Sequence, residues 1–221
     1  MQGISQQTSV VTGAAQGNGR AIAIGLAAAG ARVACCDINT EALAETVDFI
    51  TRAGGTAIAV RLDISDEAAC ANAARQVKAE LGDAAILVNN AGIIRRTPPD
   101  AESFPDDWSA IMSVNATGTI QMIRAFLPQL RANRGRIVNI ASIMSVAAGP
   151  GQTAYAASKG AVLQMTKALA HDLADDGIRV NAIAPGVIET PMTVVTRANP
   201  ESIGRFMAHT PMKRPGKPEE L

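Results

Sequence analysis

The hydrophobic and polar positions divide the chain into short apolar runs and longer amphipathic segments, which alternate along most of its length. Several short runs are continuous and rich in β-branched residues, as is typical of strands covered on both faces. They predict strands over 9–12, 32–36, 57–62, 86–89, 136–141 and 179–184. Apolar residues at helical spacing predict helices over 18–30, 40–53, 66–81, 101–132 with a break, and 152–175.

Glycines punctuate the ends of several predicted helices. Gly30, Gly54 and Gly177 each stand shortly before a predicted strand. Strict alternation of strand and helix implies right-handed crossovers between parallel strands. We therefore predict an α/β protein with a doubly wound parallel sheet, formed as a single domain over residues 1–221.

Composition narrows the class of protein. The 221 residues carry 20 Lys and Arg against 20 Asp and Glu, which favours neither nucleic acid nor an anionic membrane as a partner. Neither a signal peptide nor a membrane-spanning run is recognised, which predicts a cytoplasmic protein. The three cysteines have neither metal-ligand spacing nor the pattern of a disulfide framework, so no metal is expected.

A glycine-rich segment, "TGAAQGNG", follows the first predicted strand. Its residues Gly13, Gly17 and Gly19 stand where a βαβ unit passes from strand to helix. Free backbone N–H groups and the positive end of the helix dipole point there, and glycine lets a phosphate approach the backbone. Because the spacing differs from the commoner G-x-G-x-x-G, the segment predicts either a pyrophosphate site or an ordinary turn.

Asp37 ends the second predicted strand, 20 residues after Gly17. A carboxylate at that place can accept hydrogen bonds from an adenosine ribose diol and repels a 2′-phosphate. No arginine follows it, since the next residues are Ile38 and Asn39. We therefore predict NAD rather than NADP as the cofactor. The alternative role for Asp37, or for Asn39, is that of N-cap of the next helix.

The segment "YAASK" carries candidate chemistry. Tyr155 is the only tyrosine, and it precedes Lys159 by four residues, so the two side chains share one face of a helix. An ammonium group about 4 Å away contributes roughly 4 kcal/mol at an effective dielectric constant of 20, which could bring the phenol pKa from about 10 to near 7. Such a phenol can exchange a proton with an alcohol or ketone while hydride moves. The alternative is a solvated Tyr–Lys pair.

Two further polar residues stand at informative places. Ser142 follows the strand predicted over 136–141, and the carboxyl ends of parallel strands form the ligand crevice, so Ser142 could contact a substrate oxygen. Asn115 interrupts an otherwise helical run. It is a candidate site residue, with a surface position or a helix kink as the alternative.

In combination these residues resemble the short-chain dehydrogenase/reductase family over essentially the whole chain. The matching pieces occur in order and at the family's spacing, and they are "TGAAQGNG", "CDI", "LD", "NNAG", "VN", "IAS", "YAASK" and "PGVIET". The resemblance implies a Rossmann-type dehydrogenase domain. It also implies an oxidoreductase that transfers a hydride between NAD and a secondary alcohol or ketone.

The resemblance also implies a role for each matching residue. Tyr155 is then the general acid/base, Lys159 lowers its pKa and holds the ribose of the nicotinamide half, and Ser142 orients the substrate. Asn115 would anchor a water in a proton relay through Lys159. The residues implied in cofactor binding are Gly13, Gly17, Asn18, Gly19, Asp37, Ile38, Asp63, Ile64, Asn89, Ala91, Gly92, Tyr155, Lys159, Pro185, Gly186, Ile188 and Thr190.

The chain departs from the family pattern in two places. Asn18 replaces an aliphatic residue, and the chain stops at Leu221, where the family continues with a helix and a last parallel strand. We therefore expect that helix and strand to be absent and one edge of the sheet to be exposed. The resemblance further suggests a homo-oligomer, a tetramer or a dimer, built from the helices at about 115–132 and 152–175.

The substrate is predicted from fewer residues. Arg95 and Arg96 stand in "IIRR", a run similar to that of sugar-acid dehydrogenases of the family, and arginine suits carboxylates and phosphates. Two solvated loop arginines are the alternative. Residues 193–212 are expected to form a substrate lid, in which His209 either touches the substrate or is simply exposed.

Three functions therefore remain open. The leading one is NAD-dependent oxidation or reduction of a polyol, sugar or sugar acid. An NADPH-dependent reductase of 3-oxoacyl thioesters is the second, which Asp37 disfavours. A non-catalytic nucleotide-binding protein on the same fold is the third, and the complete set of candidate catalytic residues argues against it.

Overall fold

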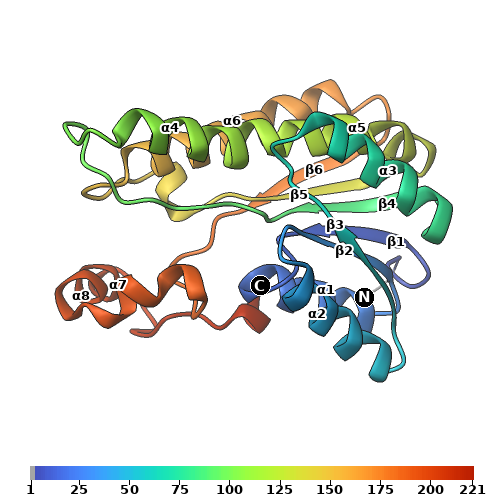
Figure 1. Ribbon diagram of the computed structural model, residues 1–221, viewed down its shortest axis with the longest axis horizontal. Coiled ribbons are helices and arrows are strands. Elements are labelled where there is room, and N and C mark those ends of the chain that lie inside the picture. The colour runs from blue at the N-terminus through green and yellow to red at the C-terminus, as the bar shows by residue number, and fades with distance from the viewer. Residues whose placement is uncertain (1–2) are drawn as a thin grey trace.

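The computed structural model describes residues 3–221, in which a six-stranded sheet lies between two layers of helices (Figure 1). The strands are β1 Thr8–Thr12, β2 Arg32–Asp37, β3 Thr56–Arg61, β4 Ala84–Asn89, β5 Arg136–Ile140 and β6 Arg179–Ile183. All neighbours pair in parallel, in the order β3-β2-β1-β4-β5-β6. The predicted doubly wound sheet is confirmed, and the strand order reverses between β1 and β4, where ligands bind in such sheets.

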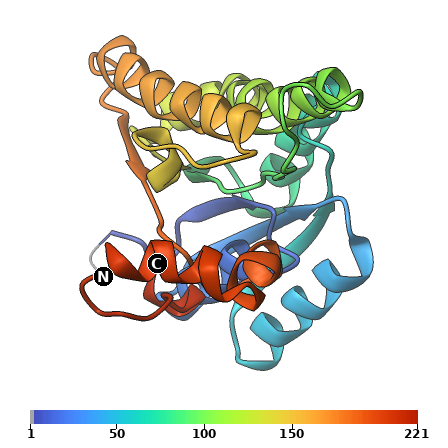
Figure 2. The same cartoon turned by 90° about the vertical axis from the view of Figure 1, so that its left-hand side faces the viewer.

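The helices divide between the two faces of the sheet. They are α1 Gly17–Ala28, α2 Thr40–Arg52, α3 Glu67–Leu81, α4 Phe104–Met112, α5 Thr119–Ala132, α6 Thr153–Asp172, α7 Val194–Ala198 and α8 Pro200–Ala208. α3, α4, α5 and α6 lie on one side, and α1 and α2 on the other (Figure 1). Figure 2 looks from the carboxyl ends of the strands and shows α7 and α8 on the side of α1 and α2. No helix within residues 3–221 is both long and apolar enough to cross a membrane.

Alternate residues of the central strands pack into two separate cores, one on each face of the sheet. In β2, Cys36 packs in the core beneath α3 and α5, whereas Cys35 packs in the core beneath α1 and α2. Both thiols and that of Cys70 are free and buried. Burial raises the pKa of Cys35 to about 12, so this thiol stays protonated and unreactive.

The break predicted within 101–132 is a π-helical turn. It spans Ser113–Gly118 and joins α4 to α5 without interrupting the helical path. Such turns are rare and often occur at functional sites, because they re-aim one side chain out of the regular helical repeat. The turn contains Asn115, the residue that the sequence singled out.

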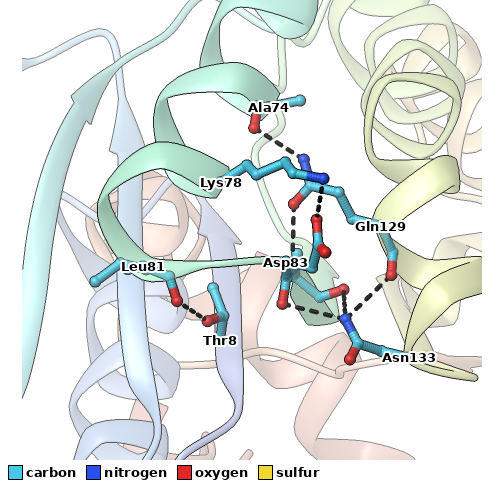
Figure 3. A network of polar contacts seen from close by, with 8 residues as sticks. Thr8, Ala74, Lys78, Leu81, Asp83, Gln129 and Asn133 are labelled. Atoms are coloured by element: carbon cyan, nitrogen blue, oxygen red, sulfur yellow. Dashed lines mark hydrogen bonds and ion pairs between the residues drawn. The ribbon is translucent and has the colours of Figure 1, made fainter.

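A polar network holds the amino end of β4 between α3 and α5 (Figure 3). The buried side chain of Gln129 accepts a hydrogen bond from the backbone N–H of Ala84 at 2.9 Å and donates one to the carbonyl of Ala74 at 2.8 Å. Asn133 donates to the carbonyls of Asp83 and Ala84. These contacts position β4, whose carboxyl end leads into the "NNAG" segment.

Replacing Gln129 with Leu tests this network. The backbone N–H of Ala84 would stay buried without its partner, at a cost of about 1–3 kcal/mol, whereas the carbonyl of Ala74 would lose only a side-chain donor and keep its place inside α3. We expect the free energy of unfolding, measured by urea denaturation, to fall by about 1–3 kcal/mol. Gln76→Leu, at an exposed site on α3, is the control and should change it by less than about 0.5 kcal/mol. A Gln129→Leu protein as stable as the parent would contradict this role.

Candidate active site

A cavity of about 450 Å³ opens at the carboxyl ends of β1, β2 and β4. It lies at the point where the strand order reverses, as expected for a doubly wound sheet. Among the residues predicted to bind the cofactor, those that line it are Gly13, Gly17, Asn18, Asp37, Ile38, Asp63, Ile64, Ala91, Gly92 and Thr190. Asn90, which the sequence argument left out although it belongs to "NNAG", also lines it.

The glycine segment forms a tight turn into α1. Gly13 and Gly17 have φ angles of +67° and +53°, which favour glycine. A Cβ on Gly19 would lie 2.0 Å from the carbonyl oxygen of Gly13, so the close approach of α1 to this turn requires glycine there. Gln16, the residue before α1, makes no side-chain cap, which leaves the first N–H groups of the helix without a side-chain partner.

The carboxylate of Asp37 faces the glycine segment. Its Oδ2 accepts a hydrogen bond from the backbone N–H of Ala15 at 3.1 Å, and its Oδ1 accepts one from that of Asn39 at 3.0 Å. Asn39 is the N-cap of α2, since its side chain accepts a hydrogen bond from the N–H of Ala42. The structure therefore gives the N-cap role to Asn39 and leaves the Asp37 carboxylate in the cavity wall.

These features fit a dinucleotide. The uncapped end of α1 suits a pyrophosphate, and a carboxylate at the end of β2 suits a ribose diol. The side-chain oxygen of Asn18 is buried beside the same helix end without a hydrogen-bond partner among the described residues. No group of three or more His, Cys, Asp and Glu side chains within residues 3–221 is arranged to hold a metal ion.

Tyr155 and Lys159 lie in the first two turns of α6. Their side chains are buried, with 8% and 5% of each residue exposed, so they are not a solvated pair. The ammonium group of Lys159 donates a hydrogen bond to the carbonyl of Ile140 at 2.7 Å, and it lies 6.0 Å from the centre of the Tyr155 ring. α6 thus brings both groups to the carboxyl end of β5.

The electrostatics of this pair differ from the sequence-based expectation. Burial raises the pKa of Tyr155, and the Ser142 side chain and the positive charge of Arg96 lower it by less. Burial also lowers the pKa of Lys159 to about 8. In the free chain the desolvation of the Tyr155 phenol therefore outweighs the lowering of its pKa by Ser142 and Arg96.

Ser142 is oriented by a short 3₁₀ turn, Ile143–Ser145, that follows β5. Its hydroxyl oxygen accepts a hydrogen bond from the backbone N–H of Met144 at 3.1 Å. Its hydroxyl hydrogen remains available as a donor. The Ser142 side chain also lowers the pKa of Tyr155, which places it near the phenol at the end of β5.

Asn115 is almost completely buried, which excludes a surface position. Its amide accepts a hydrogen bond from the N–H of Ile93 at 2.8 Å and donates to the carbonyl of Ile93 and to the hydroxyl of Ser158. A Cβ on Gly92 would lie 3.1 Å from its Oδ1. Asn115 therefore ties the segment after β4 to α6.

The remaining predicted cofactor residues lie outside the lining of this first cavity. Asn89 is buried within the sheet and donates a hydrogen bond to Asn139 at 2.9 Å. Pro185 and Ile188 follow β6, and the carbonyl of Pro185 accepts a hydrogen bond from the N–H of Ile143. Gly186 belongs to a second cavity, of about 830 Å³.

The second cavity lies between the loop after β5 and the lid predicted over 193–212, which folds into α7 and α8. Arg96 and His209 line it, whereas Arg95 forms an ion pair with Asp107 at 2.6 Å and does not. Gln152 and Arg205 also line it, and the sequence argument missed both. No motif marks them, because only the packing of α8 over the end of β5 brings them together.

The fold and the placement of these residues define a nucleotide-dependent oxidoreductase of the Rossmann type. The model of the short chain dehydrogenase family matches residues 7–201. The chain therefore belongs to the short-chain dehydrogenase family, whose members act on CH–OH groups.

Three relatives place the chain within that family. The 2-(R)-hydroxypropyl-CoM dehydrogenase of Xanthobacter autotrophicus is 42% identical over 214 residues, covering 95% of this chain and 86% of the relative. A 3-oxoacyl-[acyl-carrier-protein] reductase of Thermotoga maritima is 38% identical over 218 residues, covering 96% and 85%. A crystal structure from Beutenbergia cavernae, provisionally assigned as an NAD(P)-dependent gluconate 5-dehydrogenase and holding NADP, superposes with a TM-score of 0.91 at 41% identity, covering 98% and 86%.

Proposed function

We propose that the chain is an NAD-dependent dehydrogenase acting on a secondary alcohol or ketone of a polyol, sugar or sugar acid. The observation that carries the choice of NAD is the Asp37 carboxylate, which the N–H groups of Ala15 and Asn39 hold in the cavity wall. Its lone pairs remain sufficient to accept hydrogen bonds from a ribose diol. Its charge opposes a 2′-phosphate at the same place.

Each candidate catalytic residue has a separate role in the reaction. The nicotinamide ring, when bound, supplies a two-electron hydride acceptor or donor. As hydride leaves the carbinol carbon, Tyr155 takes the hydroxyl proton and a ketone forms; the reverse reaction returns the proton. Ser142 donates a hydrogen bond to the substrate oxygen. Lys159 supplies a positive charge near Tyr155, and its hydrogen bond to the carbonyl of Ile140 fixes the position of the ammonium group.

Thermal melts of the chain with NAD and with NADP test this proposal. A ligand present at about 100 times its Kd stabilises the native state by about 2.7 kcal/mol, or several degrees for a chain of this size. We expect a clear rise in Tm with NAD and a smaller one with NADP. A rise with NADP alone would overturn the Asp37 argument and favour the 3-oxoacyl-thioester reductase. No rise with either nucleotide would refute a nucleotide-dependent enzyme.

We also propose that the enzyme is a homo-oligomer, a tetramer or a dimer, assembled through α5 and α6. Both helices lie in the layer that covers β4, β5 and β6 (Figure 1). Ala156 and Gly160, four residues apart on α6, are partly exposed, and small residues of this kind let a second helix approach closely. The free, buried thiols suit the reducing cytoplasm, where we place the enzyme.

A further inference from the structure

The wall of the second cavity carries positive charge without compensating negative charge. Arg96 and Arg205 line it, and no Asp or Glu of residues 3–221 does. Two guanidinium groups around one cavity repel each other, and an anion between them removes that cost. The charge distribution therefore favours a negatively charged occupant.

The two neighbouring arginines of "IIRR" have different surroundings. Arg95 is neutralised by Asp107, which also accepts a hydrogen bond from Thr97. The guanidinium of Arg96 forms no ion pair with any carboxylate of the described chain. Its Nη2 donates to the hydroxyl of Thr196 on α7 at 2.6 Å, which anchors the group at the cavity while its other N–H donors stay available.

Arg205 reaches the same cavity from α8, on the lid. It too is without an ion pair among the described residues. The two guanidinium groups therefore come from separate elements, the segment after β4 and the lid. An oxyanion bound by both would connect the lid to the body of the protein, and arginine's planar donors suit carboxylate, sulfonate or phosphate groups.

A third observation points to a ligand with hydroxyl groups. Gln152 is 8% exposed and lines the cavity, and its side-chain oxygen is buried without a hydrogen-bond partner. A buried acceptor left unpaired costs about 1–3 kcal/mol, which a donor on a bound ligand would remove. Gln152 precedes Tyr155 by three residues, so this donor would lie near the reacting group.

We propose that the substrate carries an oxyanion that binds between Arg96 and Arg205, and a hydroxyl group that donates to Gln152. This inference rests on the proposed function and deepens it, since it requires an anionic hydroxy compound or its ketone. The chemistry is unchanged. The carbinol C–H bond breaks with transfer of hydride to NAD, the O–H proton passes to Tyr155, and the oxyanion takes no part in bond making. The effect of Arg96 on the pKa of Tyr155 places the guanidinium within electrostatic reach of the phenol.

Matched charged and uncharged probes test the inference. The pairs are gluconate with gluconamide, 2-hydroxypropanesulfonate with 1,2-propanediol, and glycerol 3-phosphate with glycerol, which separate carboxylate, sulfonate and phosphate. Binding is read from the Tm of the chain with and without NADH, and turnover from NAD reduction. We expect at least one anion to bind or react about tenfold better than its uncharged partner, since hydrogen bonds to charged groups are the stronger ones.

Substitutions of single residues test whether the two arginines cause the preference for the anion. Arg96→Gln and Arg205→Gln should each reduce the preference for the anion by about tenfold or more, whereas Arg95→Gln, the matched neighbour, should change it by less than about twofold. Gln152→Leu should weaken binding of both members of a pair and leave their ratio unchanged. Equal binding of all charged and uncharged partners would overturn the inference, and so would equal effects of Arg95→Gln and Arg96→Gln.

Failure of this inference is distinguishable from failure of the proposed function. Butan-2-ol is an uncharged secondary alcohol, and its slow oxidation with NAD reports the catalytic residues without the arginines. Turnover of butan-2-ol without any preference for anions would overturn the anion site alone. An anion-dependent rise in Tm without any effect of NAD or NADP would support the anion site and refute the dehydrogenase.

Discussion

Tyr155→Phe is expected to lower kcat by a hundred- to ten-thousandfold, because phenylalanine can neither accept nor donate the proton that accompanies hydride transfer. The change removes a single hydroxyl group from a buried ring, so the packing around α6 should persist. The measurement is the rate of NADH formation with the best substrate of the probe panel. A variant with unchanged kcat would refute the role proposed for Tyr155.

The rise in Tm caused by NAD separates loss of chemistry from loss of the site. It should be retained in Tyr155→Phe, because Tyr155 does not line the cavity that the glycine segment and Asp37 form. Ser109→Ala, which likewise removes one hydroxyl group but at an exposed position of α4, is the control and should leave kcat within about twofold. Loss of the NAD effect in Tyr155→Phe would mean that the variant fails through its structure.

The pH dependence follows from the same residue. Burial raises the pKa of Tyr155, so the phenol is protonated over the neutral range in the free chain. Oxidation of the alcohol needs the phenolate and should speed up as pH rises toward that pKa. Reduction of the ketone needs the protonated phenol and should slow down over the same range. Tyr155→Phe should abolish both dependences.

The cofactor preference should change when Asp37→Ser is combined with Ile38→Arg. The first change removes the charge that opposes a 2′-phosphate, and the second supplies a cation that can bind it. Ile38 is 65% exposed, so an arginine is sterically tolerated there. We expect the ratio of kcat/KM for NAD to that for NADP to fall by about a hundredfold, which corresponds to about 2.7 kcal/mol.

Single substitutions separate the effect of removing the Asp37 charge from the effect of adding the arginine. Asp37→Asn keeps the size of the side chain and removes its charge, and it should account for about a tenfold change in the ratio. Asn39 is left in place in every variant, because it caps α2 and its loss would cost about 1 kcal/mol of stability. A double variant with an unaltered ratio would show that Asp37 does not read the ribose.

Much of the fold was predictable because its signals are local. Continuous apolar runs identify β1, β2 and β4 as buried parallel strands, and helical periodicity identifies the helices between them. The break predicted within 101–132 corresponds to a π-helical turn that contains Asn115, although the helical path continues through it. The pattern does not reveal the π-helical turn or the partners of Asn115, which come from the segment after β4 and from α6.

The surroundings of the charged residues could not be predicted from the local sequence. Arg95 and Arg96 are adjacent and alike in sequence, yet one pairs with Asp107 and the other lines the second cavity. The spacing of Tyr155 and Lys159 correctly places them on one helix face. The pKa values of both depend on burial, and that of Tyr155 also depends on Arg96, which lies far away along the chain.

The sequence by itself determined the order of strands and helices, the glycine turn into α1, and the helix face that carries Tyr155 and Lys159, because each depends on residues within a few positions of one another. Only the tertiary structure decided that Asn39 rather than Asp37 caps α2, and that Arg96, Gln152 and Arg205 meet in one cavity. The physical reason is that burial and electrostatic environment are set by chain segments distant in sequence. Local sequence patterns therefore do not reveal the burial or the electrostatic environment of a residue.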